Sequence, residues 1–198
     1  MTTSTRTEFV THEAFSLISI RGHIDEHFVI PTMALDNPTL PIIIDTAHVD
    51  RLNSFGLRTW LLWISELSKA ERPLFFVRCA PPIVTQANYV ANFLGSGQVL
   101  SFYAPYWCSV CGGSALELIE LRAPTPTPTP TPAPTPAPAP DHRPRPATRL
   151  CSACALPLEL AEVEEEYFGL IERQATASIP EEFWTLLDAI LQRLPEAP

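Results

Sequence analysis

Apolar residues in the first half of the chain follow the spacing of strands in four places. Residues 15–22, FSLISIRG, alternate apolar and polar positions and predict a strand that ends at Gly22. Residues 40–49, LPIIIDTAHV, hold three consecutive isoleucines and predict a strand that is covered on both faces. Two further apolar runs, RPLFFVRCA at 72–80 and QVLSFYAPYW at 98–107, predict two more strands.

Between these strands the spacing of apolar residues becomes helical. Residues 57–67 repeat apolar positions every three or four residues and predict a helix that runs to about Lys69, with Ser54 as its N-cap. After Pro81 a second helix is predicted, and Gly95 is expected to end it. The alternation of strands and helices predicts an α/β fold, in which helices pack on at least one face of a parallel sheet.

Three other segments have less regular patterns. Residues 1–8 are polar and predict a flexible N-terminus. Residues 23–35 predict a continuation of the first strand, followed by a short helix-like piece that Pro31 interrupts. Residues 156–173 begin as a strand and become helical.

The last predicted helix has the clearest signals at its start. Ser178 is expected to cap it, Pro180 suits its first turn, and Glu181 completes a capping box. Six residues form its apolar stripe: Phe183, Leu186, Leu187, Ile190, Leu191 and Leu194. We expect this stripe to pack on the rest of the protein or, if it is exposed, to bind in a groove of a partner.

Four of the five cysteines form two CxxC pairs, Cys108 with Cys111 and Cys151 with Cys154. A tight turn within each pair points both sulfurs at one ion, so the four thiolates predict a tetrahedral zinc site in a zinc ribbon. The 39 residues between the pairs are about twice the usual separation of 15–20. Because four sulfur ligands leave no open position for water, we expect the Zn²⁺ ion to be structural and not hydrolytic.

Alternatives to this assignment stay open. The CxxC turns of two different chains could pair, and the thiols could belong to a zinc-dependent redox sensor. The fifth cysteine, Cys79, ends an apolar run and is expected to be a buried structural thiol. A second metal site at His23 and His27 is disfavoured, because ligands four residues apart align only on a helix and this segment is turn-like.

A proline-rich tract separates the two cysteine pairs. Residues 124–146 hold 11 of the 22 prolines. Because proline fixes φ and has no amide hydrogen, we expect a disordered or polyproline II insertion. The sequence therefore predicts five parts: a flexible N-terminus at 1–8, an α/β domain at 9–105, zinc-ribbon halves at 106–122 and 148–163, the insertion at 123–147, and C-terminal helices at 164–198.

Charge and composition narrow the classes of function. The formal net charge is −9, and residues 106–198 contribute −7 of it, with 6 Lys and Arg against 13 Asp and Glu. This acidic half disfavours binding to nucleic acid.

The sequence shows neither a signal peptide nor a run of about 20 apolar residues, and its cysteines have the spacing of metal ligands. We therefore expect a cytoplasmic protein that does not contact a membrane. No nucleophile with a base, paired carboxylates or phosphate-binding glycine loop is evident, so we expect no enzymatic activity.

Two short motifs of the α/β half lie where one predicted element ends and the next begins. GHID at 22–25 follows the first strand; Asp45 ends the next one, and NSFGL at 53–57 opens the helix. In motif position and element order, residues 8–105 resemble a STAS domain, the fold of bacterial anti-sigma factor antagonists, whose motifs read Gly-Glu-Leu-Asp and Asp-Ser-Ser-Gly-Leu. The resemblance implies a regulatory protein partner, such as an anti-sigma factor or a related kinase.

The second motif departs from the family at two positions. The resemblance implies that a partner kinase phosphorylates the serine before the glycine, but this position is Phe55, and Asn53 replaces an aspartate. We therefore expect a non-enzymatic bacterial adaptor that binds its partner through Asn53, Ser54, Phe55 and Gly56, without the usual phosphate switch. Trp60 and Trp63 are expected to be packing residues of one helix; Trp63 lies off the main helical stripe, so a place at a partner surface is its alternative. A phospho-regulated antagonist that uses Ser54, a zinc-ribbon nucleic-acid binder and a redox sensor stay as alternatives.

Overall fold

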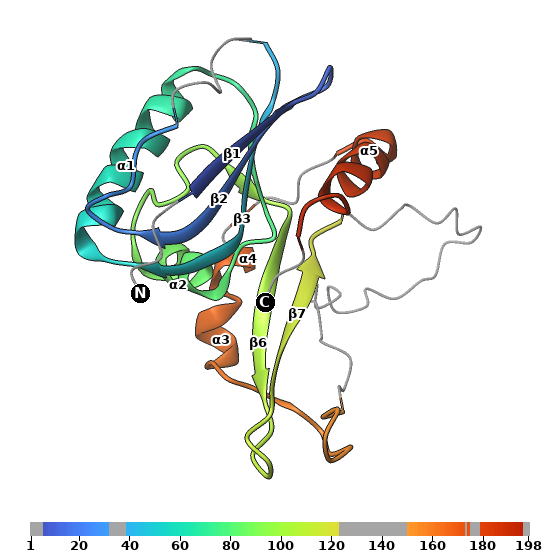
Figure 1. Ribbon diagram of the computed structural model, residues 1–198. Coiled ribbons are helices and arrows are strands. Elements are labelled where there is room, and N and C mark those ends of the chain that lie inside the picture. Colours follow the sequence, from blue (N-terminus) through green and yellow to red (C-terminus); the bar gives the residue numbers. More distant parts are fainter. Residues whose placement is uncertain (1–5, 32–38, 123–149, 173, 175–178, 196–198) are drawn as a thin grey trace, which may run out of the picture.

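The computed structural model describes residues 6–31, 39–122, 150–172, 174 and 179–195. Its centre is a five-stranded sheet in the order β1-β2-β3-β4-β5 (Figure 1). These strands are β1 (Arg6–Thr11), β2 (Ser16–Ile24), β3 (Ile42–Leu52), β4 (Leu74–Val77) and β5 (Gln98–Val99). β2 to β5 are parallel, and β1 is antiparallel to β2. The predicted α/β class is confirmed, with a mixed sheet.

β1 is a strand that the apolar pattern does not predict, whereas β2 continues past Gly22 as expected from residues 23–35. β1 pairs with β2 from Arg6 to Thr11, and Arg21 of β2 forms a salt bridge with Glu8 of β1 at 3.0 Å. The prediction of a flexible N-terminus is therefore wrong for residues 6–8. β2 continues past Gly22 to Ile24, through irregularities in its pairing with β3. Glycine suits the second of these sites, between Gly22 and His23, because its φ is 83°. Residues 25–31 contain no helix, and residues 32–38 lie outside the described part.

Helices cover both faces of the sheet, as the run of isoleucines in β3 predicts. Ile42 and Ile44 pack with α1 (Ser54–Lys69) and α2 (Pro81–Tyr89) in the larger apolar core. Ile43 points to the other face, where it packs with α5 (Glu181–Leu191). Successive residues of a strand face opposite ways, so a strand between two helical layers needs consecutive apolar residues, as at positions 42–44.

α1 begins one residue earlier than a cap at Ser54 would place it. The N-cap is Asn53, whose side-chain oxygen accepts a hydrogen bond from Gly56 N at 2.9 Å, so the prediction that Ser54 caps the helix is wrong. Asn53 also donates to Glu26, at 3.0 Å. Asparagine caps a helix at least as well as serine, and its amide can hold a second partner at the same time.

The start of α1 lies directly against the end of β2. A Cβ atom at Gly56 would stand 2.0 Å from the carbonyl oxygen of Ile24, and Asn53 N donates to that same oxygen at 3.1 Å. Glycine is therefore needed here for close approach of the two backbones. α2 ends at Tyr89, well before Gly95, because Val90 already has an extended backbone.

A second, three-stranded sheet is built on the end of the first one. Its order is β7-β6-β8, with β6 (Ser101–Trp107) between β7 (Ser114–Glu120) and β8 (Glu159–Leu160). β6 also bonds to Cys79, the second residue after β4: Cys79 N donates to Ser101 O at 3.0 Å, and Tyr103 N donates to Cys79 O at 2.8 Å. β6 thus connects the three-stranded sheet to the five-stranded one, and the predicted end of the α/β domain at residue 105 falls inside this strand.

The segment after β8 packs on the larger core. α3 (Glu164–Tyr167) and α4 (Gly169–Glu172) place Tyr167 and Phe168 against Phe102 of β6, at centroid distances of 6.2 and 5.9 Å. The Tyr167 hydroxyl donates to the Tyr103 carbonyl at 2.5 Å, and burial raises its pKa. Asn88 of α2 donates to the Tyr167 carbonyl at 2.9 Å. The predicted C-terminal helices are therefore part of the core.

α5 packs on the sheet through its predicted apolar stripe, and the ring centroids of Phe183 and Phe15 lie 5.5 Å apart. Its N-cap is Pro180, and the predicted cap Ser178 lies outside the described residues, as does the predicted insertion at 123–147. Arg122 ties β7 to α5, since it bonds Asp188 at 2.7 Å and stacks on Trp184. Of the helices in the described residues, none is both long and apolar enough to cross a bilayer.

A buried ion pair lies between the sheet and the end of α5. Asp45, which was expected to end its strand, lies inside β3 and is fully buried. Its carboxylate accepts from Arg78 at 2.6 and 3.1 Å and from Ser19 at 2.9 Å. Arg78 also donates to the Pro195 carbonyl at 3.2 Å. Buried charges are tolerated only when they are paired and hydrogen-bonded in this way.

We predict that Gly56→Ala destabilises the fold by about 3 kcal/mol, since the added methyl would collide with a backbone carbonyl that cannot rotate away. Urea unfolding followed by circular dichroism measures the change. The matched control is Ser65→Ala at an exposed position of the same helix, where we expect a change within about 0.5 kcal/mol. Equal stability of the two variants would contradict the close approach of α1 and β2.

Candidate metal centre

The two CxxC pairs form turns with the same backbone hydrogen bonds. In each turn the first cysteine donates its N–H to the carbonyl five residues later, and its own carbonyl accepts from the N–H four residues later. The distances are 2.7 and 2.9 Å at Cys108, and 2.7 and 2.8 Å at Cys151. The fourth residue after each of these cysteines, Gly112 or Ala155, has a positive φ, of 72° or 57°. The chain therefore builds one local structure twice.

The two turns face each other and bring all four sulfurs within 4.8 Å of one another. Cys108 Sγ lies 3.4 Å from Cys154 Sγ, and Cys111 Sγ lies 3.4 Å from Cys151 Sγ. The separation between Cys111 and Cys154 is 3.7 Å. These distances are far above the ~2.05 Å of a disulfide, and all four thiols are free. The four predicted ligands thus meet within one chain, without a second copy.

Strand pairing positions the cluster. The first turn connects β6 to β7 at the far end of their hairpin, and the second turn precedes β8, which pairs with the same end of β6 (Figure 1). Cys108 and Cys151 are buried, whereas Cys111 is exposed. Gly113 packs against the cluster, since a Cβ there would lie 3.4 Å from the sulfurs of both Cys111 and Cys151.

Backbone amides prepare the first cysteine of each turn to be a thiolate. The amides of Ala153 and Cys154 lower the pKa of Cys151 to about 6, and the amides three and two positions after Cys108 lower the pKa of Cys108. At Cys154 the amide of Leu156 also lowers the pKa, but the other three sulfurs outweigh it and raise the value to about 12. A bound cation would favour the ionised form of all four.

This arrangement can hold one metal ion. Four soft sulfur donors select a thiophilic metal, and a tetrahedral ion bound by all four would have no position left for substrate or water. The sequence identified the ligands, and the Gly112-Gly113 pair after the first CxxC also indicated a tight turn there. The contact of Gly113 with both turns depends on the fold and could not be predicted from the sequence.

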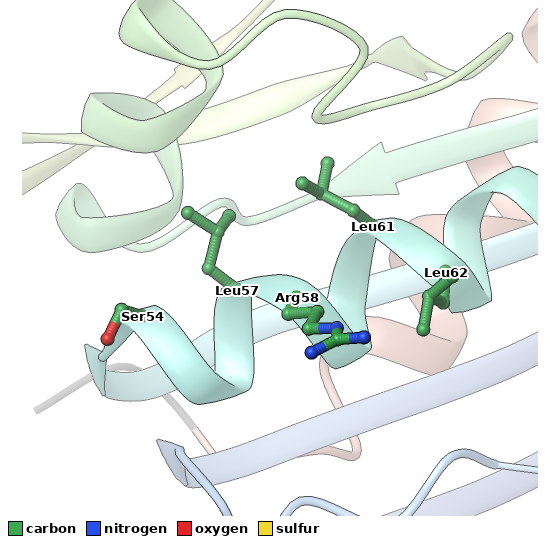
Figure 2. A pocket seen from close by; sticks show the side chains of 5 residues that line it. All are labelled: Ser54, Leu57, Arg58, Leu61 and Leu62. Carbon is green, nitrogen blue, oxygen red and sulfur yellow. The ribbon is translucent and has the colours of Figure 1, made fainter.

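The predicted partner surface lies at the other part of the fold. Ser54 and Phe55 are exposed, Phe55 to 69%, whereas Gly56 is buried against β2. Along the same helix runs a shallow hollow of about 330 Å³ (Figure 2). Five residues line it: Ser54, Leu57, Arg58, Leu61 and Leu62. Leu62 is 59% exposed, so apolar surface continues for two turns beyond Phe55.

Three further features singled out in the sequence are Trp63, Cys79 and the pair His23 and His27, and none of them belongs to the cysteine cluster. Trp63 is buried and its ring packs edge-on against that of Trp60, with centroids 5.5 Å apart, so its predicted packing role is confirmed and the alternative place at a partner surface is wrong. Cys79 is buried as predicted, and burial raises its pKa to about 12. His27 lies near Asp25 and Glu26 on the surface, and His23 is not part of that group.

A scan against protein-family models finds none that matches this chain, and a search of the curated proteins finds no match to its sequence.

We predict opposite effects from exchanging the residues that adopt a positive φ. Ala155→Gly removes the cost of a Cβ in the left-handed region and should raise the free energy of unfolding by about 0.5–1 kcal/mol. Gly112→Ala introduces that cost and should lower it by about 1–2 kcal/mol, without a clash, since nothing lies within 4 Å of the added atom. Denaturant unfolding with metal present measures both. Destabilisation by Ala155→Gly would contradict the equivalence of the two turns.

Proposed function

We propose that the cysteine cluster is a structural zinc centre. A tetrahedral Zn²⁺ with Zn–S bonds of ~2.3 Å separates its sulfurs by about 3.8 Å, and the sulfurs here lie 3.4 to 3.7 Å apart at three of their contacts. The ion would close the end of the β6–β7 hairpin onto the segment that carries Tyr167 and Phe168 into the core. The metal thus supports folding rather than a reaction.

The purified protein should contain one zinc ion per chain. Inductively coupled plasma mass spectrometry of protein prepared with zinc measures this, and Cys151→Ser should lose most of the metal. Cys79→Ala is the matched control, since Cys79 is a buried cysteine outside the cluster, and it should keep its zinc. Chelation should also lower Tm, because it releases the segment that fastens α3 and α4. Metal-free protein with four reactive thiols would contradict the proposal.

We further propose that the protein is a non-enzymatic bacterial regulatory adaptor with a STAS-like α/β unit. The supporting observation is the exposed start of α1. Phe55 and Leu62 are largely exposed, and a hollow lined by Leu57 and Leu61 runs beside them. An aromatic ring beside an apolar hollow suits a protein partner, and Asn53 keeps the helix start rigid through its two hydrogen bonds.

A phospho-regulated antagonist is the second candidate, and one observation favours it. Ser54 is exposed at the first position of α1, and its hydroxyl is not needed as the N-cap, since Asn53 fills that role. A phosphate there would be stabilised by the amides and dipole of the helix start. It would also place negative charge beside Arg58 at the hollow.

We predict that Phe55→Ser leaves the fold intact and weakens partner capture at least about tenfold, because Phe55 is exposed and removing its ring takes away an apolar anchor. Tagged wild type and variant are used to purify partners from the native host, and each protein recovered is quantified by mass spectrometry. Val110→Ser, equally exposed on the ribbon, is the control. Equal recovery with Phe55→Ser would contradict this surface, and a phosphate on Ser54 of the same samples would favour the antagonist.

A further inference from the structure

We propose that the cysteine cluster is also a site of reversible oxidation, at which a hydroperoxide joins the two CxxC turns to each other by disulfides. Cys111 is the thiol that meets the oxidant, and Cys151 is the thiol that then forms a disulfide with it. Cys108 and Cys154 form the second pair. The pairing of the sulfurs follows from their positions alone, whereas the accompanying loss of metal rests on the zinc centre proposed above.

The four thiols differ in their access to solvent. Cys108 and Cys151 are buried and Cys154 is intermediate, whereas Cys111 is exposed. Its neighbour in the same turn, Val110, is 69% exposed, so this turn stands open to the solvent. Oxidation of a cysteine follows its exposure as well as its thiolate character. The sulfur that reacts first is therefore that of Cys111.

Each sulfur has a near neighbour on the opposite turn. Cys111 Sγ lies 3.4 Å from Cys151 Sγ and 3.7 Å from Cys154 Sγ, and Cys108 Sγ lies 3.4 Å from Cys154 Sγ. The two shorter contacts of Cys111 and Cys108 use all four sulfurs once, so both disulfides between the turns can form in one chain. Formation of a disulfide brings its sulfurs to ~2.05 Å, which requires each pair to close by only about 1.4 Å.

The surroundings favour the pair of Cys111 and Cys151. A Cβ atom at Gly113 would lie 3.4 Å from both of their sulfurs, so the absence of a side chain leaves these two sulfurs room to approach. The fifth thiol, Cys79, is buried outside the cluster and does not compete for an oxidised sulfur.

The chemistry consumes one hydroperoxide for each disulfide. A thiolate attacks an oxygen of the hydroperoxide, the O–O bond breaks, an alcohol or water leaves with a proton, and the sulfur becomes a sulfenic acid. The partner thiolate then attacks this sulfur, so that the S–S bond forms, the S–O bond breaks and the hydroxyl group leaves as water. Two thiols and one hydroperoxide thus give one disulfide, one alcohol or water, and one further water.

Disulfides between the turns would hold the same segments that the ion would hold. Cys111 lies in the turn between β6 and β7, and Cys151 lies in the segment that precedes β8. A sulfur in a disulfide is no longer a thiolate ligand. Oxidation would therefore release the metal and keep β8 beside β6. Disulfides within the two turns would instead leave β8 with its two-residue pairing alone.

The test uses the full chain, purified with zinc under reducing conditions and titrated with hydrogen peroxide. The remaining thiols are alkylated, and tryptic peptides are analysed by mass spectrometry. Two equivalents of peroxide should link the peptide with Cys108 and Cys111 to the peptide with Cys151 and Cys154 and release the zinc to a chromogenic chelator. After one equivalent, alkylation should remain at Cys108 and Cys154. Dithiothreitol should undo the link.

Stability and a control variant complete the test. The oxidised, metal-free protein should have a Tm at least about 5 °C above that of the reduced protein after chelation, because its turns stay joined. Cys79→Ala should form the same link as the wild type. Zinc content before oxidation tests the zinc centre and the linked peptides test the disulfide pairing, so failure of one is distinguishable from failure of the other. Disulfides within either turn, or four thiols that stay free in excess peroxide, overturn the proposal.

Discussion

One strand, β6, carries the constraint on which the rest of the fold depends. Its first residues bond to the backbone at Cys79, beside the end of β4, and its last residues pair with β7 and β8. Phe102 faces the aromatic residues of α3 and the following turn. Cys108 follows the strand directly. A shift of β6 by one residue would turn Phe102 out of the core and displace Cys108 from the cysteine cluster, so the register of this strand fixes the α/β core and the cluster together.

The cluster in turn explains how two distant segments can form one sheet. β8 has two residues and could not hold its place by strand pairing alone. An ion held by Cys108 and Cys111 of the β6–β7 turn and by Cys151 and Cys154 would anchor the segment that precedes β8. The long separation between the cysteine pairs is tolerated, because the entropy of closing a loop rises only by about 0.6 kcal/mol for each doubling of its length. Coordination of a single ion is worth much more than that.

Sequence patterns reveal those features that depend on neighbours along the chain. The isoleucine run at 42–44 predicts a strand between two layers, and the two CxxC pairs predict four clustered sulfurs; both are confirmed. Features that depend on distant contacts escape this reasoning. Asn53 rather than Ser54 caps α1, and the strand at Arg6 forms because it can pair with β2. Trp63 has a polar-side position in the helical pattern but is covered by Phe28 from the loop after β2.

The start of α1 and the end of the β6–β7 hairpin depend differently on the cysteine cluster. Phe55 stands at the start of α1, whose position is fixed by the contact of Gly56 with Ile24 and by the buried aromatic cluster. Trp107 directly precedes Cys108 and pairs with Glu159 of β8, so its position depends on the closed cluster. Opening of the cysteine cluster would therefore disorganise the end of the β6–β7 hairpin first and leave the α1 surface in place. The proposed ion would thus act on one end of the molecule alone, where it would hold β8 and the hairpin together.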